Sequence, residues 1–320
     1  GLEGSAAAKA AAASEIPTLE AFSKRFIEEY AEANRQKPSG IAAKQTILDT
    51  HLIPLLGQKR LDEIGPAEVQ KVKLALKGKN AKTTNNVLSV LHTALTVAAE
   101  WGVLPGQPCA MSLLPYERPE RAFWDFEELE QLVGAARDLG WREHLVVLLG
   151  SKAGLRCGEI MALAWTDVDL KRQRLAVRSS EWKGQLTETK GRKVRLVPLA
   201  SPLYAALKAH RHLRSERVLS RDDGTPLTQK IVRTIVQRCE RAASLRALGV
   251  HALRHTFCSH LAMRGVPARA IQELAGHAHL STTMGYMHLS PAAVESAIRT
   301  LETGFGRGEM GETASGQDAK

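Results

Sequence analysis

The sequence predicts a mainly α-helical protein with a small antiparallel β-sheet, an α+β fold. Two observations carry this prediction. Apolar residues recur at helical spacing through most of the 320 residues, whereas short β-rich stretches occur only between residues 175 and 199. Helices and strands do not alternate along the chain, which argues against a doubly wound parallel sheet. The length allows two domains.

Residues 16–116 are expected to form an all-α domain. Thr18 is a suitable N-cap for a first amphipathic helix, and the apolar pattern behind it stops at Pro38–Gly40. Further helical patterns lie at about 41–53, 66–77 and 83–101. A linker follows at residues 105–119. Residues 1–15 are rich in alanine and have no apolar face, so we expect a disordered leader or linker there.

Residues 117–303 are expected to form a second, α+β domain, followed by a flexible tail at 304–320. Asp125 can cap a helix that runs to about residue 138, and the apolar run at 145–149 predicts a buried helix. Short β-rich stretches predict one antiparallel sheet with strands at 175–179, 185–189 and 194–199. Helical patterns resume at 202–217, 229–243, 251–264, 267–275 and 291–301.

Composition narrows the classes of function. Lys and Arg total 44 against 34 Asp and Glu, and the net charge of +10 favours a polyanionic partner without requiring one. The four cysteines form no CxxC pair, so neither a zinc ribbon nor a disulfide framework is indicated. No apolar run approaches the ~20 residues of a membrane span, and the N-terminus lacks a signal pattern. We therefore expect a cytoplasmic protein without a membrane partner.

The helical segment that begins at His251 carries the strongest functional signal. His251 and Arg254 are three residues apart, so they share one helix face. Leu253, Phe257 and Leu261 repeat at four-residue spacing. This apolar stripe can anchor the helix in a core while the other two side chains form an anion site.

Other chemistry-bearing groups flank this helix. Arg156 and Glu159 lie upstream, and His277 and Tyr286 lie downstream. Cleavage of a phosphodiester needs a nucleophilic hydroxyl, cations for the phosphate oxygens and an acid for the leaving oxygen. Tyr286 can attack, and arginine forks match a phosphate. Singly, each residue has a structural explanation, such as an Arg156–Glu159 ion pair or a helix cap at His277, but the joint pattern is specific.

Five stretches resemble the tyrosine recombinase (phage integrase) family, within a likeness that spans about residues 18–300. They are Gly-Leu-Arg156-Cys-Gly-Glu159, Thr189-Lys190-Gly-Arg-Lys-Val-Arg195, His251-Ala-Leu-Arg254-His255, Leu274-Ala-Gly276-His277 and Thr283-Met-Gly-Tyr286-Met-His288. The resemblance implies an all-α core-binding domain followed by a catalytic domain. It also implies a site-specific recombinase that cleaves and rejoins DNA strands through a 3′-phosphotyrosine intermediate.

The same resemblance implies residue roles. Tyr286 is the nucleophile, and Lys190 is the acid that protonates the 5′-oxygen. Lys183 and Lys193 lie nearby, but the match to the following Val-Pro-Leu strand favours Lys190. The other roles are transition-state stabilisation by Arg156 and Arg254, proton acceptance or hydrogen bonding by His251, donation to the phosphate by His277, and orientation of neighbouring groups by Glu159.

The implied partner is double-stranded DNA with specific recombination sites. On this DNA the protein would self-associate to a tetramer, and accessory DNA-bending proteins are optional partners. Basic residues placed to contact DNA are Lys79, Lys82 and Arg192, although such residues also occur on solvated surfaces. The helix at 291–301 has one apolar stripe, which packs either on its own domain or on a neighbouring subunit.

No cofactor or metal is implied, because arginines take the part that Mg²⁺ plays in two-metal nucleases. His251 and His255 have a spacing that suits zinc, but the Glu of His-Glu-x-x-His and a third ligand are missing. No ATP-binding loop motif occurs. Two alternative functions stay open: a type IB topoisomerase, and a catalytically silent DNA-binding regulator. The presence of His251 and of a helical domain before the catalytic domain favours a recombinase over a topoisomerase. The complete set of catalytic residues argues against a silent regulator.

Overall fold

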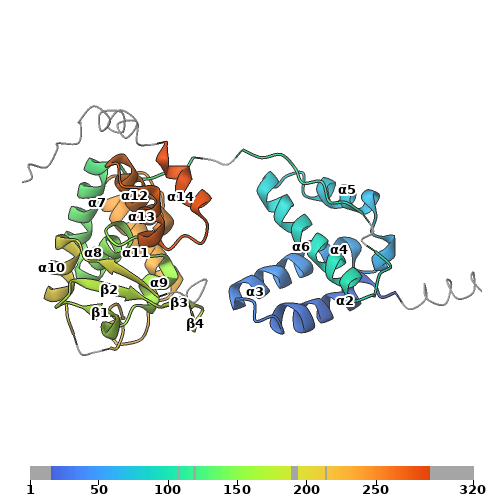
Figure 1. Ribbon diagram of the computed structural model, residues 1–320, viewed down its shortest axis with the longest axis horizontal. Helices are drawn as coiled ribbons and strands as arrows, with labels where there is room; N and C mark the ends of the chain where they lie inside the picture. The colour runs from blue at the N-terminus through green and yellow to red at the C-terminus, as the bar shows by residue number, and fades with distance from the viewer. Residues whose placement is uncertain (1–15, 107–108, 118–119, 189–193, 213–214, 289–320) are drawn as a thin grey trace, which may run out of the picture. The chain divides into compact units, whose positions relative to one another are not determined.

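The computed structural model describes residues 16–106, 109–117, 120–188, 194–212 and 215–288. The chain divides into two compact units, residues 1–120 (unit 1) and residues 121–320 (unit 2). Figure 1 shows the elements of each. The described part is mainly helical, and all its strands lie in unit 2, which confirms the predicted fold class.

Unit 1 is built around the long helix α6. Its elements are α2 (Leu19–Arg25), the π-helix η1 (Phe26–Glu32), α3 (Pro38–Ile47), the π-helix η2 (Leu48–Leu52), α4 (Ile53–Leu56), the 3-10 helix η3 (Leu61–Glu63), α5 (Pro66–Ala75) and α6 (Ala81–Glu100). The Asn80 side chain accepts a hydrogen bond from the Thr83 amide at 2.7 Å, which caps α6. Leu88, Leu91 and Leu95 share one face of α6 and are buried in the core of unit 1.

Unit 2 has a helical core and two small sheets. Its elements are α7 (Phe126–Leu139), α8 (Trp141–Ser151), α9 (Cys157–Ala162), the 3-10 helix η4 (Trp165–Asp167), β1 (Val168–Asp169), β2 (Arg174–Val177), β3 (Ser179–Trp182), β4 (Gln185–Glu188), β5 (Arg195–Pro198), α10 (Ser201–Ala209), α11 (Gln229–Ala242), α12 (Val250–Met263), α13 (Ala268–Ala275) and α14 (Leu280–Met287). Helix α8 packs on α7, α10, α11 and α12. A Cβ at Gly150 would lie 2.6 Å from the Cβ of Leu253, so glycine lets α8 and α12 approach closely.

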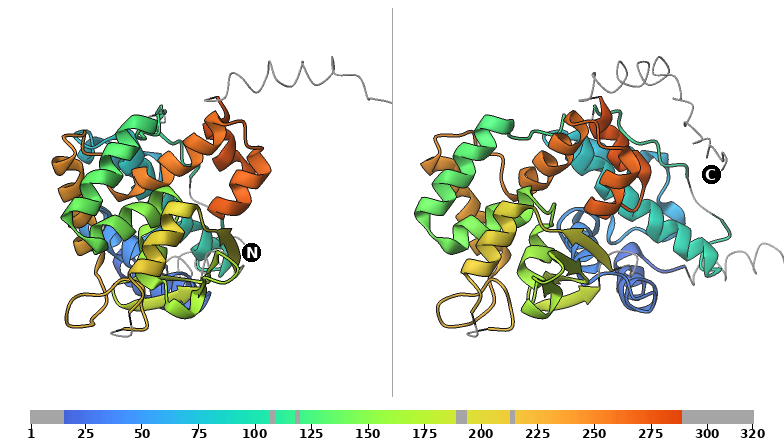
Figure 2. Two further views of the ribbon diagram at one scale, coloured as in Figure 1. Left: turned by 90° about the vertical axis from the view of Figure 1, so that its left-hand side faces the viewer. Right: turned by 60° about the vertical axis from the view of Figure 1, so that its left-hand side comes forward.

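The strands form an antiparallel sheet of order β1-β2-β5 and a separate antiparallel pair, β3-β4. Leu175 pairs with Val197 in the first sheet, and both side chains are buried. The same register places Arg195 opposite Val177, at the start of β5. Figures 1 and 2 show the strands on one side of unit 2 and helices α7, α12 and α14 on the opposite side.

Three element predictions are wrong in detail. The expected single sheet is two sheets, because β2 pairs with β5 whereas β3, directly after it, pairs with β4. Pro38 begins α3 rather than ending a segment, since the fixed φ of proline suits a first helical turn. The helix expected at 202–217 ends at Ala209, because the later residues form a backbone pairing in which the Trp165 amide donates to Glu216 and the Val218 amide donates to Leu163.

Helix α14 is not predicted by the sequence. Its Ser, Thr and Gly residues are weak helix formers, and it forms because Thr283 and Tyr286 are buried against α12 and α13. The expected leader at 1–15, the helix at 291–301 and the tail at 304–320 lie outside the described residues. Within the described ranges, every helix is too short or too polar to cross a membrane.

Candidate active site

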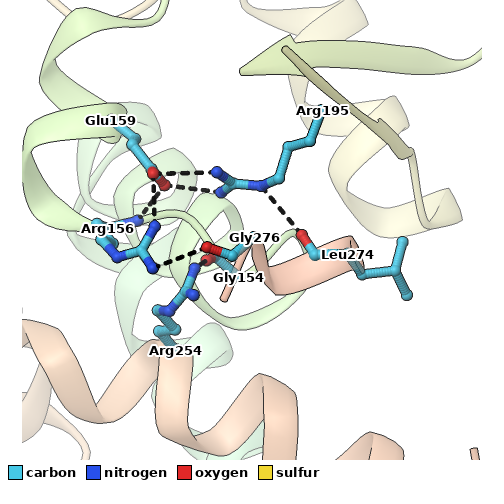
Figure 3. A network of polar contacts seen from close by, with 7 residues as sticks. All are labelled: Gly154, Arg156, Glu159, Arg195, Arg254, Leu274 and Gly276. Atoms are coloured by element: carbon cyan, nitrogen blue, oxygen red, sulfur yellow. Dashed lines mark hydrogen bonds and ion pairs between the residues drawn. The ribbon is translucent and has the colours of Figure 1, made fainter. Parts of the chain in front are cut away.

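A network of charged side chains surrounds the first turn of α9 (Figure 3). Glu159 stands at its centre and is 3% exposed. Arg156 Nη1 donates to Glu159 Oε1 at 2.8 Å, while Arg195 Nη1 and Nη2 donate to Oε1 and Oε2 at 3.0 and 2.7 Å. The Arg156 amide also donates to Glu159 Oε2 at 2.8 Å, which caps α9. We call Arg156, Glu159 and Arg195 the Glu159 network.

The Glu159 carboxylate stays ionised at neutral pH. Burial acts to raise its pKa, but the hydrogen bonds and charge of Arg195 and the charge of Arg156 outweigh burial and lower the pKa to about 2. Two cations then share one buried anion. The network therefore keeps an excess positive charge beside α12.

Both arginines of the network also bind the C-terminal end of α13. Arg195 Nε donates to the Leu274 carbonyl at 3.0 Å, and Arg156 Nη2 donates to the Gly276 carbonyl at 3.1 Å. Gly276 ends α13 in the left-handed conformation, and a Cβ there would lie 3.0 Å from the Arg195 side chain. Glycine at this position therefore allows both the turn and the close approach of Arg195. His277 follows directly.

Arg254 is a second buried cation, held on α12. Arg254 is 4% exposed, and its Nη1 donates to the Gly154 carbonyl. Its Nη2 is buried and has no hydrogen-bond partner among the described residues. Burial and the charge of Arg156 lower the pKa of Arg254 to about 10, so the guanidinium is still charged at neutral pH. Figure 3 shows the Arg254 and Arg156 guanidinium groups side by side, next to the Gly154 and Gly276 carbonyls.

Two histidines predicted for the site are neutral at neutral pH. Partial burial and the charges of Arg254 and Arg156 lower the pKa of His251, which lies on α12. The same causes lower the pKa of His277 to about 3, and its Nδ1 lies 2.9 Å from Thr283 Oγ1. A neutral imidazole can accept a proton at one ring nitrogen, and while it is neutral it can donate one hydrogen bond without adding charge to the site.

Tyr286 lies on α14 and is 2% exposed. Its hydroxyl is 2.7 Å from Nδ1 of His255, and its ring is parallel to that of His277 with a centroid distance of 6.2 Å. Burial raises the pKa of Tyr286 to about 12, and burial and the charge of His251 lower the pKa of His255 to about 4. Both groups are therefore neutral at neutral pH, and we assign the phenol as the donor and Nδ1 of His255 as the acceptor.

Five predicted catalytic residues and the supporting residue Glu159 are described by the structure. Arg156, Glu159 and Arg254 lie together, and His277 follows the Gly276 carbonyl that Arg156 binds. Lys190 and Arg192 lie outside the described residues. Lys79 and Lys82 belong to unit 1, where both are exposed at the start of α6.

Three residues with close contacts in the site were not assigned a role from the sequence. Arg195 completes the Glu159 network, and His255 binds the Tyr286 hydroxyl. Arg121 lies with its guanidinium carbon 4.4 Å from the Tyr286 ring centroid. Arg195 and His255 stand within the motifs that the sequence shows, which is the signal that could have drawn attention to them. Arg121 has no such signal.

Among the described residues, no group of three or more His, Cys, Asp or Glu side chains is arranged to hold a metal ion.

The sequence of this chain matches two known protein-family models. The phage integrase family matches residues 122–293, more than half of the chain. The chain belongs to the phage integrase family. The N-terminal SAM-like domain of phage integrases matches residues 18–74, in unit 1. Membership identifies the chain as a tyrosine recombinase, an enzyme that breaks and rejoins DNA strands.

Similar sequences and structures agree with this membership. The tyrosine recombinase XerC of Thermodesulfovibrio yellowstonii is 32% identical over 231 residues, 67% of this chain and 73% of that protein. A XerC-like tyrosine recombinase of Caldanaerobacter subterraneus is 28% identical over 271 residues, 73% of this chain and 69% of that protein. The fold resembles the Tn1549 transposon integrase in complex with transposon right end DNA, with a TM-score of 0.74 at 19% identity, covering 87% of this chain and 98% of that one. A lambda integrase tetramer bound to a Holliday junction gives a TM-score of 0.66 at 18% identity, covering 82% and 78%.

Proposed function

We propose that this phage integrase family member cuts DNA at specific sites with Tyr286 as nucleophile and with Arg156 and Arg254 holding the scissile phosphate. The Tyr286 oxygen forms a bond to phosphorus while the bond to the 5′-oxygen breaks. Lys190, outside the described residues, gives its proton to that oxygen. The products are a 3′-phosphotyrosine and a free 5′-hydroxyl. Attack by a 5′-hydroxyl from another strand reverses these steps and rejoins the DNA without ATP.

The observation that carries this proposal is the buried Nη2 of Arg254, which has no hydrogen-bond partner in the part of the chain that the structure describes. It lies near the Arg156 guanidinium, whose charge acts on Arg254. A buried charged donor without a partner is costly, and a phosphate oxygen would supply the missing hydrogen bond. The Glu159 network holds Arg156 at the same place. Two arginine forks in fixed positions can then stabilise the charge that develops on the phosphate oxygens.

The neutral histidines fit proton transfer in this scheme. We assign Thr283 as donor to His277 Nδ1, which leaves the proton on Nε2, free to donate to a phosphate oxygen. The phenolic proton of Tyr286 has to leave as the bond to phosphorus forms. His251 and His255, both on α12, are neutral imidazoles that can receive it.

The proposed partner is double-stranded DNA carrying specific recombination sites. In support, the Tn1549 integrase and lambda integrase structures are complexes with DNA, and one lambda integrase structure is a tetramer on a Holliday junction. We propose that this chain likewise forms a tetramer on paired sites, with residues 291–301 docking on a neighbouring subunit. Lys79 and Lys82 would contact phosphates from unit 1.

Covalent trapping tests the proposal. A duplex nicked just downstream of the scissile phosphate loses its 5′-hydroxyl fragment after cleavage, so the enzyme stays attached to DNA. We expect a denaturant-resistant adduct with the wild type and with Tyr204→Phe, but none with Tyr286→Phe, which should keep its DNA affinity. An adduct on Tyr286→Phe would show that another residue attacks.

A further inference from the structure

Tyr286 is enclosed by protein in this structure, and from this position its hydroxyl cannot attack a DNA phosphate. The side chain is 2% exposed and belongs to a small core with Phe257, Cys258 and Ile271. A nucleophilic oxygen has to come within about 3–3.5 Å of its target atom in a near-attack arrangement. A duplex phosphate cannot come that close to a hydroxyl enclosed by protein, so α14 has to shift before Tyr286 can react.

Arg121 makes the contacts that oppose such a shift. Its guanidinium carbon lies 4.4 Å from the centroid of the Tyr286 ring, and its Nη1 donates to the Thr282 carbonyl at 2.8 Å. A Cβ at Gly285 would lie 3.0 Å from the same Nη1. Glycine beside the tyrosine thus lets the guanidinium lie directly against the α14 backbone. Arg121 binds both the ring and the helix that carries it.

The place of Arg121 in the chain links these contacts to unit 1. Arg121 is the first residue of unit 2, so the segment that enters from unit 1 ends at it. The side chain is partly exposed, and a DNA phosphate offers an arginine a stronger, bidentate partner than an aromatic ring. Helix α14 itself is short, and no side-chain hydrogen bond caps its first turn. Displacement of Arg121 would therefore leave α14 with fewer contacts.

We propose that Arg121 is a positioning residue that holds Tyr286 in the enclosed position, and that DNA binding displaces Arg121 and so releases the tyrosine toward Arg156 and Arg254. The inference rests on the proposed role of Tyr286 as nucleophile. The hydrogen bond from the hydroxyl to His255 adds to the same enclosed arrangement. Arg121 acts through the tyrosine and does not touch the phosphate in this arrangement.

Chemical modification of the full chain without DNA tests the resting contact. N-acetylimidazole acetylates accessible tyrosines, and tryptic peptide 270–299 contains no tyrosine except Tyr286. We expect Arg121→Ala to raise the acetylation rate of Tyr286 roughly tenfold, the change expected from losing a cation–π contact and a hydrogen bond from a charged donor. Tyr204 should react at the wild-type rate, which shows that unit 2 is folded.

Two further variants sharpen the test. Arg264→Ala removes a similar contact, in which a guanidinium carbon lies 4.6 Å from the centroid of the Phe126 ring, and should leave Tyr286 acetylation unchanged. Arg121→Gln keeps a donor for the Thr282 carbonyl but loses the charge, so Tyr286 should be acetylated at a rate between those of wild type and Arg121→Ala. This variant also provides the test if Arg121→Ala does not fold. An acetylation rate at Tyr286 that stays at the wild-type value in the folded Arg121 variants overturns the inference.

Adduct formation on a nicked duplex gives the second readout. If Arg121 holds back the tyrosine, folded Arg121 variants should form adduct faster than wild type at equal DNA occupancy. A slower rate would place Arg121 in the reacting arrangement and overturn the proposal. If Tyr286→Phe still forms adduct, the proposed function fails, yet the acetylation result still decides whether Arg121 encloses Tyr286. The two failures are thus distinguishable.

Discussion

The Glu159 network and the surroundings of Tyr286 lie in the same unit but are held by different forces. In the network, two arginines share a buried carboxylate and also bind carbonyls at the end of α13. Around Tyr286, two hydrogen bonds between neutral groups, ring contacts and Arg121 hold a helix of eight residues. The comparison teaches that Arg156, which we propose to bind phosphate, is held by ion pairs to a buried carboxylate, whereas the proposed nucleophile lies on a helix held by weaker contacts.

The largest effect is expected from breaking the network at its centre. Glu159→Ala leaves Arg195, whose side chain is 11% exposed, as a buried charge without its anion. We expect the free energy of unfolding of unit 2 to fall by about 3–5 kcal/mol. Urea unfolding followed by tryptophan fluorescence measures this, since four of the five tryptophans lie in unit 2. Glu130→Ala, which removes the exposed partner of Lys152, should cost less than about 1 kcal/mol. Equal losses in the two variants would contradict the comparison.

The second effect concerns Arg254, which we propose holds the scissile phosphate together with Arg156. Arg254→Ala removes the cation with the unpartnered Nη2, and we expect cleavage to slow by about 10²–10³-fold, the loss typical of one transition-state donor. The initial rate of adduct formation at saturating protein measures this. Arg254→Lys keeps a charge without the fork and should fall between alanine and wild type. Wild-type cleavage by Arg254→Ala would exclude the residue from the site.

The third effect is the pH dependence that the neutral histidines produce. The pKa of His255 is lowered to about 4 in the folded protein, so its neutral form is favoured by folding. This stability is present above the unfolded pKa of about 6.5 and is lost as the pH falls toward the folded pKa. With a discount for solvent screening, we expect unit 2 to lose roughly 1–2 kcal/mol from this group between pH 7 and pH 5. His255→Gln should flatten that slope, and an identical slope in the variant would refute the assignment.

The smallest effect is expected from the hydrogen bond that orients His277. Thr283 is fully buried, and Thr283→Val keeps its shape but removes the hydroxyl that contacts Nδ1. We expect the stability of unit 2 to fall by about 0.5–1.5 kcal/mol and cleavage to slow modestly, because the imidazole loses its fixed tautomer. Thr282→Val, at a partly exposed position of the same helix, is the control. A loss as large as that of Glu159→Ala would mean that both regions are fixed equally firmly.

Several parts of the fold and site were predictable because their signals are local. Helical spacing predicted α12, in which Leu253 and Phe257 are buried, and Asp125 caps α7 as expected. The i, i+3 pair Arg156–Glu159 was weighed either as an ion pair or as part of a catalytic site. The structure shows the ion pair, and it also shows that the pair orients Arg156 beside Arg254.

The remaining features depend on partners that are far apart in sequence. Arg195 binds Glu159 across 36 residues, His255 binds Tyr286 across 31, and Arg121 binds Thr282 across 161. Helix α14 forms against α12 and α13 despite weak helix formers. No periodicity within a short window contains such information.

The sequence by itself determined which residue types are available and which of them share a helix, because periodicity and capping act within a few residues. The spacing predicted the mainly helical fold, and the resemblance of five stretches to tyrosine recombinases indicated the family and the candidate set around Arg156, Arg254 and Tyr286. Only the tertiary structure decided that Arg156 and Arg195 share one buried carboxylate while the tyrosine is enclosed and hydrogen-bonded to His255. The physical reason is that burial, hydrogen bonding and pKa shifts arise from groups brought together by packing, and packing joins segments that sequence spacing leaves unrelated.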